Sequence, residues 1–345
     1  MKILAIDTSC DETAAAVVDG RRVLSNVVYS QVELHGKWGG VVPSLAKRAH
    51  DERLPHIVAK ALNRHHDIRA IAVTQGPGLA IALESGIKYA KHLAVTMNIP
   101  LVAVNHMEGH LYSAFVQNSQ GNPPRDFMFP YIGVLVSGGH SEFVIWTDHL
   151  TYQVIGETVD DAAGEALDKA ARLLGFGYPG GAVLERLAAE VSNVDKYKFT
   201  RPMLKSGDLN LSFSGLKTAL LYLYRTLSEA ERQTEIKYIA SSFQEAVFDT
   251  IFKKLNKAML QTGITNLTTG GGVVANQYFK KKLRSLAKSH KGTVLFPPSN
   301  YLTRDNAAMI GVVASYKLQR GITVSDIASL DRHPRMRLDA YQQSV

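Results

Sequence analysis

The sequence predicts an α/β protein built from two similar halves. Residues 3–19 and 132–148 match in length and chemistry: each is an apolar strand, a short loop rich in Ser, Thr or Gly, and a second apolar strand ending in Asp. Elsewhere, strand patterns alternate with helical patterns, which is typical of α/β proteins. A duplicated architecture, with one loop of each half facing a shared cleft, accounts for this better than two unrelated β-hairpins.

Hydrophobic periodicity locates the other elements. Strands are expected at residues 70–74, 101–105, 264–268 and 293–296, and helices at 54–63, 84–96, 161–174, 182–191, 214–227, 235–262, 276–290 and 306–319. A linker at 121–126 divides the chain into a first lobe, 1–125, and a second lobe, 126–305, with a helical insertion. The segment 306–330 is expected to pack back on the first lobe, and the tail from 332 to run extended over the surface.

Composition narrows the class of protein. The chain has 345 residues, 46% hydrophobic and 20% charged, which suits two globular domains. Its formal net charge of +8 suits nucleic acid or a phosphorylated substrate, and equally a basic surface without such a partner. Cys10 is the single cysteine, so no internal disulfide can form. Without a leader or a membrane-spanning stretch, a cytoplasmic protein of bacterial or archaeal type is expected.

His106 and His110 are candidate metal ligands. On a helix, residues four apart lie on one face, where two imidazoles can grip one ion. Two histidines rarely fill the coordination shell, so a third ligand is needed. Asp305 can supply it, although an Asp before a helix also suits an N-cap. Iron, zinc and manganese all fit such a set, and a pair of surface histidines is the alternative.

Glycine-rich segments indicate contact with a nucleotide. Residues 270–276 follow a strand and open a helix, where backbone N–H groups favour anions. Asn276 can offer its amide to a ribose or base. The hairpin loop at 137–141 lacks the Lys of a Walker loop, so we interpret it as a phosphate-facing turn. Asp168 can accept ribose hydroxyls or be a solvated helix charge.

A basic helix near the end of the second lobe is a candidate RNA contact. Its spacing spreads the charges around the helix, and a solvated face is the alternative. The basic residues are Lys280, Lys281, Lys282, Arg284, Lys288 and Lys291.

Taken together, these motifs resemble the TsaD family, the tRNA N6-adenosine threonylcarbamoyltransferases formerly described as O-sialoglycoprotein endopeptidases. Ten stretches carry the resemblance in family order. They are residues 6–13, 39–43, 76–78, 105–110, 135–141, 164–169, 178–181, 212–218, 270–276 and 305–309.

The resemblance implies an ASKHA fold, the plan of actin, sugar kinases and Hsp70, with two duplicated α/β lobes around a nucleotide cleft. It implies transfer of a threonylcarbamoyl group from threonylcarbamoyl-adenylate to N6 of adenosine 37 in tRNAs that read codons beginning with A, with AMP leaving. One divalent metal ion per subunit, Fe²⁺ or alternatively Zn²⁺, would be held by His106, His110 and Asp305. The adenylate, or ATP or ADP in its place, would be held by Leu135, Val136, Ser137, Gly138, Gly139, Asp168, Gly181 and Asn276.

The family also implies partners: tRNA, an inactive paralogue of the same fold (TsaB) and an ATPase (TsaE), or a second copy of the chain. No membrane partner is expected. Two positions depart from the family pattern, Ser44 in place of Glu and Glu84 in a helix start that is usually small and apolar, and they put partner specificity in doubt. Asp11 and Glu12, in the first hairpin loop, are candidate bases for the attacking amine.

Three rival functions are weaker. A metalloprotease would need His-Glu-x-x-His, but Glu108 lies one position too late for that motif. A small-molecule kinase of the same fold would use Mg²⁺, which prefers oxygen ligands to a histidine pair. A nucleotide-sensing partner protein would be expected to lose the histidines.

Overall fold

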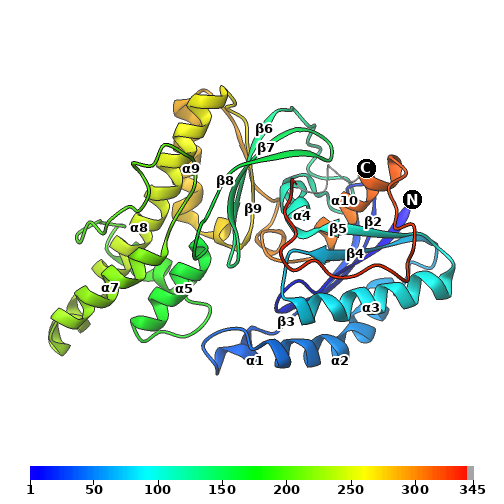
Figure 1. Ribbon diagram of the computed structural model, residues 1–345, viewed down its shortest axis with the longest axis horizontal. Helices are drawn as coiled ribbons and strands as arrows, with labels where there is room; N and C mark the ends of the chain where they lie inside the picture. The colour runs from blue at the N-terminus through cyan, green and yellow to red at the C-terminus, as the bar shows by residue number, and fades with distance from the viewer. Residues whose placement is uncertain (340–345) are drawn as a thin grey trace. The chain divides into compact units, whose positions relative to one another are not determined.

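The structure is a computed structural model that describes residues 1–339, and it divides into two compact units (Figure 1). Of the described residues, unit 1 holds Met1–Phe129, Thr147–Gln153 and 296–339. Unit 2 holds Pro130–Trp146 and Val154–Leu295. Among the described residues, no helix combines the length and apolar character that crossing a bilayer requires.

Unit 1 is a five-stranded mixed sheet in the order β3-β2-β1-β4-β5. β1, β2 and β3 pair antiparallel, whereas β4 and β5 run parallel to β1. The strands are β1 (Lys2–Asp7), β2 (Glu12–Asp19), β3 (Arg22–Ser30), β4 (Ile68–Gly76) and β5 (Leu101–Asn105). The helices are α1 (Val32–Gly36), α2 (Pro43–Leu62), α3 (Ala80–Met97), α4 (His106–Tyr112) and α10 (Ala307–Gln319).

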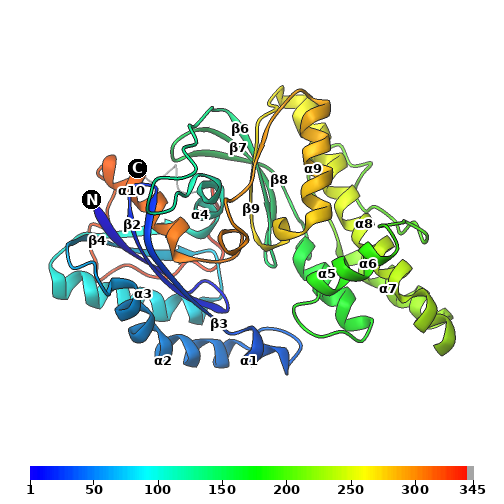
Figure 2. The same ribbon diagram turned by 180° about the vertical axis from the view of Figure 1, so that it is seen from behind.

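Helices cover both faces of this sheet, because its strands are apolar on both sides. On one face, Leu4 and Ile6 share a buried cluster with Leu54 of α2 and Ile87 of α3. α2 and α3 lie together below the sheet in Figures 1 and 2. On the other face α10 packs so closely that a Cβ on its Gly311 would lie 2.7 Å from a methyl carbon of Val18 and 3.1 Å from the Ala5 Cβ.

Unit 2 contains a second five-stranded sheet, in the order β10-β9-β6-β7-β8. The strands are β6 (Tyr131–Val136), β7 (Ser141–Asp148), β8 (Thr151–Glu157), β9 (Leu267–Gly270) and β10 (Val294–Leu295). The helices are α5 (Ala163–Leu173), α6 (Gly181–Glu190), α7 (Ser214–Thr226), α8 (Glu229–Thr262) and α9 (Gln277–Ser289). One 3-10 turn of unit 2 lies at Gly272–Ala275, and unit 1 has 3-10 turns at Ser113–Phe115 and Asn300–Leu302.

Read from the opposite edge, the second sheet repeats the first strand for strand: β8, β7, β6, β9 and β10 stand where β3, β2, β1, β4 and β5 stand. The two similar segments of the sequence are the antiparallel pairs β1–β2 and β6–β7. The predicted α/β class and the duplication are therefore confirmed.

The division into units differs from the predicted lobes at two places. The first crossing falls between Phe129 and Pro130, and Phe296–Asp305 belongs to unit 1 instead of the second lobe. The physical reason lies in two contacts within unit 1. The Arg125 guanidinium donates to the Phe296 carbonyl, and Asp305 lies against the two histidines of α4. Asp305, which the sequence assigns to the second lobe, therefore belongs to the same unit as the two histidines.

Candidate metal and nucleotide sites

The two candidate histidines stand on a short helix that the sequence caps tightly. α4 begins directly after β5, and the Asn105 side chain accepts the Met107 N–H at 2.8 Å. Glu108 returns its carboxylate to the Asn105 N–H at 3.2 Å, which completes a capping box. His106 and His110 consequently lie one turn apart on one face, with ring centroids 4.7 Å apart.

Asp305 meets both imidazoles. Its Oδ1 lies 3.3 Å from His106 Nε2 and 3.4 Å from His110 Nε2, and one ligand atom of each residue lies within 4.8 Å of the others. The N-cap of α10 is Asn306, whose side chain accepts the Met309 N–H at 3.1 Å. Asp305 is therefore not the cap, and its carboxylate faces the histidines.

Charge in this triad is concentrated on buried groups. Burial lowers the pKa of His106, but the carboxylates of Asp305 and Asp7 outweigh burial and raise it to about 10. Against its own burial, the two imidazoles hold the pKa of Asp305 well below its usual range. Burial lowers the pKa of His110, so this ring is neutral. The carboxylates of Asp7 and Asp305 thus lie on opposite edges of the His106 ring, and both favour positive charge at this site.

These residues fit a divalent cation. Both ring nitrogens of His110 and the Oδ2 atom of Asp7 are buried without a hydrogen-bond partner among the described residues. Asp7 Oδ2 lies 3.6 Å from His106 Nδ1, on the ring edge away from Asp305, where a carboxylate orients a metal-binding imidazole. Two imidazoles and one carboxylate leave further coordination positions open. Sequence reasoning missed Asp7, although its place at the carboxyl end of β1 was a usable signal.

The first hairpin loop lies beside the triad. Ser9 Oγ is 3.5 Å from Asp305 Oδ2, and the Ser9 N–H donates to Asp7 Oδ1 at 3.1 Å. Asp11 is buried, and Glu12 is partly buried where β2 begins. Burial, then the charges of Asp11 and Asp305, raise the pKa of Glu12 well above its usual range.

Two buried polar residues, Gln31 directly before α1 and His50 of α2, hold this loop in place. His50 Nε2 lies 3.0 Å from the Cys10 carbonyl oxygen, and the other ring nitrogen lies 2.8 Å from Thr13 Oγ1. Gln31 donates its backbone N–H to the Asp11 carbonyl at 2.9 Å. Burial lowers the pKa of His50, so a neutral ring fixes the backbone of the loop that carries the two candidate bases.

In unit 2, the hairpin loop of β6–β7 is a tight turn with open space beside its two glycines. The His140 N–H donates to Ser137 Oγ at 3.0 Å, which closes the turn. A Cβ on Gly138 or Gly139 would meet nothing within 4 Å, so a ligand can approach this backbone. Leu135 and Val136 belong to β6, and their side chains are buried in the core. They can reach a ligand only through their backbone.

The other candidate nucleotide contacts already serve the fold. Asp168 Oδ1 accepts the N–H groups of Gly180 and Gly181 at 2.7 and 3.0 Å, where α6 begins. Asn276 caps α9 through its carbonyl, and its amide donates to Gln244 Oε1 at 2.9 Å. Asn276 keeps a second amide hydrogen, which can still serve a ligand.

The basic helix α9 is less uniformly charged than expected. Lys280 is buried, and Lys282 pairs with Glu245. The exposed cations Lys281, Arg284 and Lys288 lie three and four residues apart, so they share one face of the helix. The expected spread around the helix is therefore wrong for the exposed members.

Comparison with known proteins finds relatives over nearly the whole chain. The family model described as TsaD, tRNA N6-adenosine threonylcarbamoyltransferase, matches residues 22–312. A Syntrophotalea carbinolica protein of that name is 44% identical, over 94% of this chain and 93% of its own length. One from a Geobacter species is 46% identical over the same shares. Among solved structures, T. kodakarensis HypF has a TM-score of 0.61 at 14% identity; the match covers 94% of this chain but only 48% of HypF, and it shows a shared fold.

Proposed function

We propose that this chain, which belongs to the TsaD family of tRNA N6-adenosine threonylcarbamoyltransferases, takes its threonylcarbamoyl group from threonylcarbamoyl-adenylate. The acceptor is N6 of adenosine 37 in tRNAs that read codons beginning with A. The observation that carries the proposal is the triad of His106, His110 and Asp305, in a chain that is similar to these transferases over 94% of its length.

The triad is the proposed metal centre. A divalent cation bound there supplies Lewis acidity that polarises or orients the threonylcarbamoyl group. His106, His110 and Asp305 hold it, and Asp7 keeps the His106 ring in the required orientation. We propose iron as the metal, with zinc as the alternative, since both accept this donor set.

The donor is a mixed anhydride, and AMP leaves when the carbonyl carbon is attacked. In unit 2, the N–H groups of Gly138 and Gly139 stabilise charge on the departing phosphate, because these two residues leave the backbone open. The Ser137 N–H donates to the His140 carbonyl at 2.8 Å, so Ser137 closes the turn that presents the two glycines. The remaining proposed contacts to the nucleotide are the backbone of Leu135 and Val136, the Asp168 carboxylate with Gly181 beside it, and the second amide hydrogen of Asn276.

The adenosine amine must lose a proton, and Asp11 and Glu12 are the proposed acceptors. The pKa of Glu12 is raised towards the pH at which the enzyme works, and a general base is most effective when its pKa lies near that pH. Unimpaired turnover of both Asp11→Ala and Glu12→Ala would dispose of this role.

The partners we propose are the tRNA, an inactive paralogue of the same fold (TsaB) and an ATPase (TsaE), with a homodimer as the alternative assembly. The exposed face of α9 offers Lys281, Arg284 and Lys288 to RNA phosphates. A tRNA substrate also makes the cytoplasm the proposed location.

The proposed function is tested by measuring which tRNA nucleoside accepts the threonylcarbamoyl group. The chain, with the partner proteins if it needs them, is supplied with threonylcarbamoyl-adenylate and an unmodified tRNA that reads an A-starting codon. The digested product should contain the threonylcarbamoylated adenosine, and a matched transcript with guanosine at position 37 should contain none. Equal labelling of both transcripts would contradict the proposal, and cleavage of casein without tRNA labelling would favour the protease alternative.

A further inference from the structure

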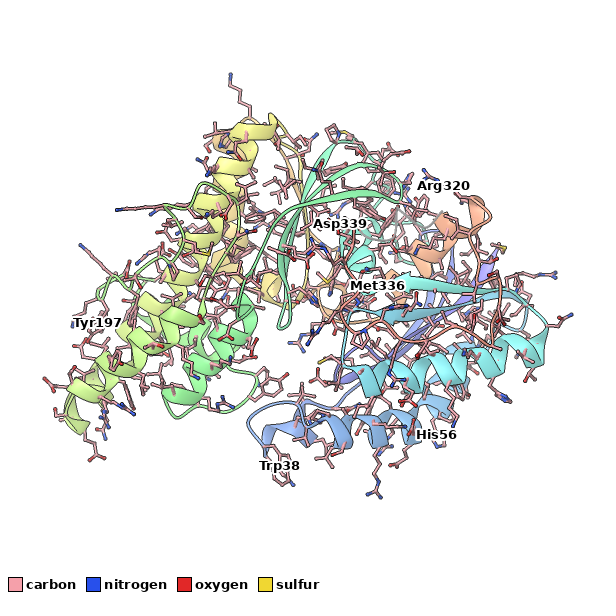
Figure 3. All side chains as sticks on the ribbon, in the orientation of Figure 1. Trp38, His56, Tyr197, Arg320, Met336 and Asp339 are labelled. Atoms are coloured by element: carbon pink, nitrogen blue, oxygen red, sulfur yellow. The ribbon has the colours of Figure 1, made fainter. Side chains whose placement is uncertain are left out.

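The C-terminal strap, residues 331–339, crosses the carboxyl ends of β4 and β5. Gln75 accepts a strap N–H at 2.9 Å, and the Gly78 N–H donates to a strap carbonyl at 3.1 Å. The Asn105 side chain donates to another strap carbonyl at 3.3 Å. Figure 3 labels Met336 and Asp339 on this segment. The strap is thus fixed to the sheet edge at three points.

This edge is also where the metal triad is built. Asn105, which holds the strap, caps α4, and His106 is the next residue. Asp7 ends β1, a parallel neighbour of β4, at the same edge. In open α/β sheets, ligands bind outside the carboxyl ends of the strands. A ligand at the strap therefore lies near the proposed reaction centre within unit 1.

A cavity of about 550 Å³ lies at the strap. Its lining includes the apolar side chains of Ile322 and Val324, and three basic residues of the strap, His333, Arg335 and Arg337. None of the described residues that line it is acidic. An apolar surface with basic groups beside it suits a planar base that carries a phosphate.

The strap arginines have different roles. Arg332 lies 3.5 Å from Glu84, so one position that departs from the family pattern anchors the strap. Arg337 pairs with Asp339 at 3.1 Å. Arg335 is exposed and forms no ion pair with any of residues 1–339. Its guanidinium is the one most available to an incoming anion.

We propose that this cavity receives a nucleotide of the tRNA anticodon loop next to the reacting adenosine, with its base against the apolar lining and its phosphate on Arg335. The inference rests on the proposed function, because it takes tRNA as the substrate. An adenosine that reacts at its exocyclic amine has to leave its stack, and single-stranded loops are recognised with their bases splayed out. The nucleotides next to that adenosine then need binding sites of their own. The strap cavity lies at the same edge of the sheet as the metal triad.

The first test compares two charge reversals. Arg335→Glu should raise the KM for tRNA about tenfold and leave kcat and the KM for threonylcarbamoyl-adenylate unchanged, because it removes one phosphate contact. Arg335→Gln should flatten the salt dependence of tRNA binding by about 0.7–0.9 in log–log slope, and Arg335→Lys should retain most of the affinity. The matched control is Arg69→Glu, an exposed residue at the amino end of β4.

The second test fills the cavity. Thr323 lines it and is exposed, so Thr323→Trp should raise the KM for tRNA without unfolding the protein. Unchanged tRNA binding in both Arg335→Glu and Thr323→Trp would overturn the inference and leave the proposed function standing. Binding that depends on Arg335, in a protein that transfers nothing to tRNA, would support the inference while the proposed function fails. Loss of affinity for free AMP but not for tRNA would also overturn the inference.

Discussion

A buried ion pair joins α4, which carries the two histidines of the metal triad, to α10, which begins two residues after Asp305. Lys317 of α10 lies 2.7 Å from Glu108 of α4, and the side chains are 1% and 3% exposed. Lys317 also donates to the Ala103 carbonyl at 3.1 Å. Where the helices cross, a Cβ on Gly109 would lie 2.9 Å from the Met309 side chain, so the pair sits at a close helix contact. We predict that Lys317→Met strongly destabilises unit 1.

The size of the effect follows from the burial. Removing the ammonium leaves the Glu108 carboxylate buried without its cation, which costs about 3–5 kcal/mol. For a unit of this size, a loss of that kind lowers Tm by on the order of 10 °C. Since Glu108 also caps α4, the loss should loosen His106 and His110, and we expect weaker metal binding in the variant.

The assay is denaturant unfolding of the parent protein, of the single variants Lys317→Met and Glu108→Gln, and of the double variant Lys317→Met/Glu108→Gln. Glutamine keeps an oxygen for the Asn105 N–H and removes the charge, so the double variant should recover most of the lost stability. A Lys317→Met variant within about 1 kcal/mol of the parent would refute the reasoning, given the cost of an unpaired buried charge. So would a double variant no more stable than Lys317→Met.

Three further predictions concern the surroundings of the two sites. Asp7→Asn should weaken metal affinity about 10–100-fold, measured by competition with a chelator; unchanged affinity would remove its orienting role. Burial lowers the pKa of His50, so below about pH 6.5 the unfolded chain takes up a proton that the folded chain refuses. Stability should fall as pH drops from 6.5, and His50→Gln should make that fall smaller, whereas His56→Gln, at an exposed position of the same helix, should leave it unchanged. Gly271 has a φ of +100°, and a Cβ there would lie 2.3 Å from the backbone oxygen of Val136 in β6, so Gly271→Ala should destabilise the protein by about 2–4 kcal/mol. Gly272→Ala, with nothing within 4 Å, should cost less than about 1 kcal/mol, and equal losses would contradict this.

Much of the fold could be predicted because its repeat is local. The pairs β1–β2 and β6–β7 can be recognised in the sequence as apolar runs around a short polar loop. The predicted strand at 101–105 has the same bounds as β5. β3 and β8 were missed because β3 is only half-buried and β8 is mixed, so neither gives a clear periodic signal. α2 was predicted too short, since Pro43 begins the helix eleven residues earlier than its apolar pattern suggested.

The site divides in the same way. His106 and His110 could be paired from their helical spacing, because both lie on one short element. Asp305 could be named but not placed, since nothing in the sequence showed that Phe296 and the residues after it belong to unit 1. The pair of Glu108 and Lys317 joins residues 209 positions apart, and no local pattern marks such a contact.

The most direct measurement is nucleoside analysis of tRNA after a single metal-depletion cycle. The chain, with its partner proteins if it needs them, is incubated with threonylcarbamoyl-adenylate and unmodified tRNA before chelation, after chelation, and after iron or zinc is returned. The account predicts threonylcarbamoylated adenosine, its loss, and its return, with no return in His106→Ala or Asp305→Ala. Full activity after complete removal of the metal, or in either variant, would contradict the central claim.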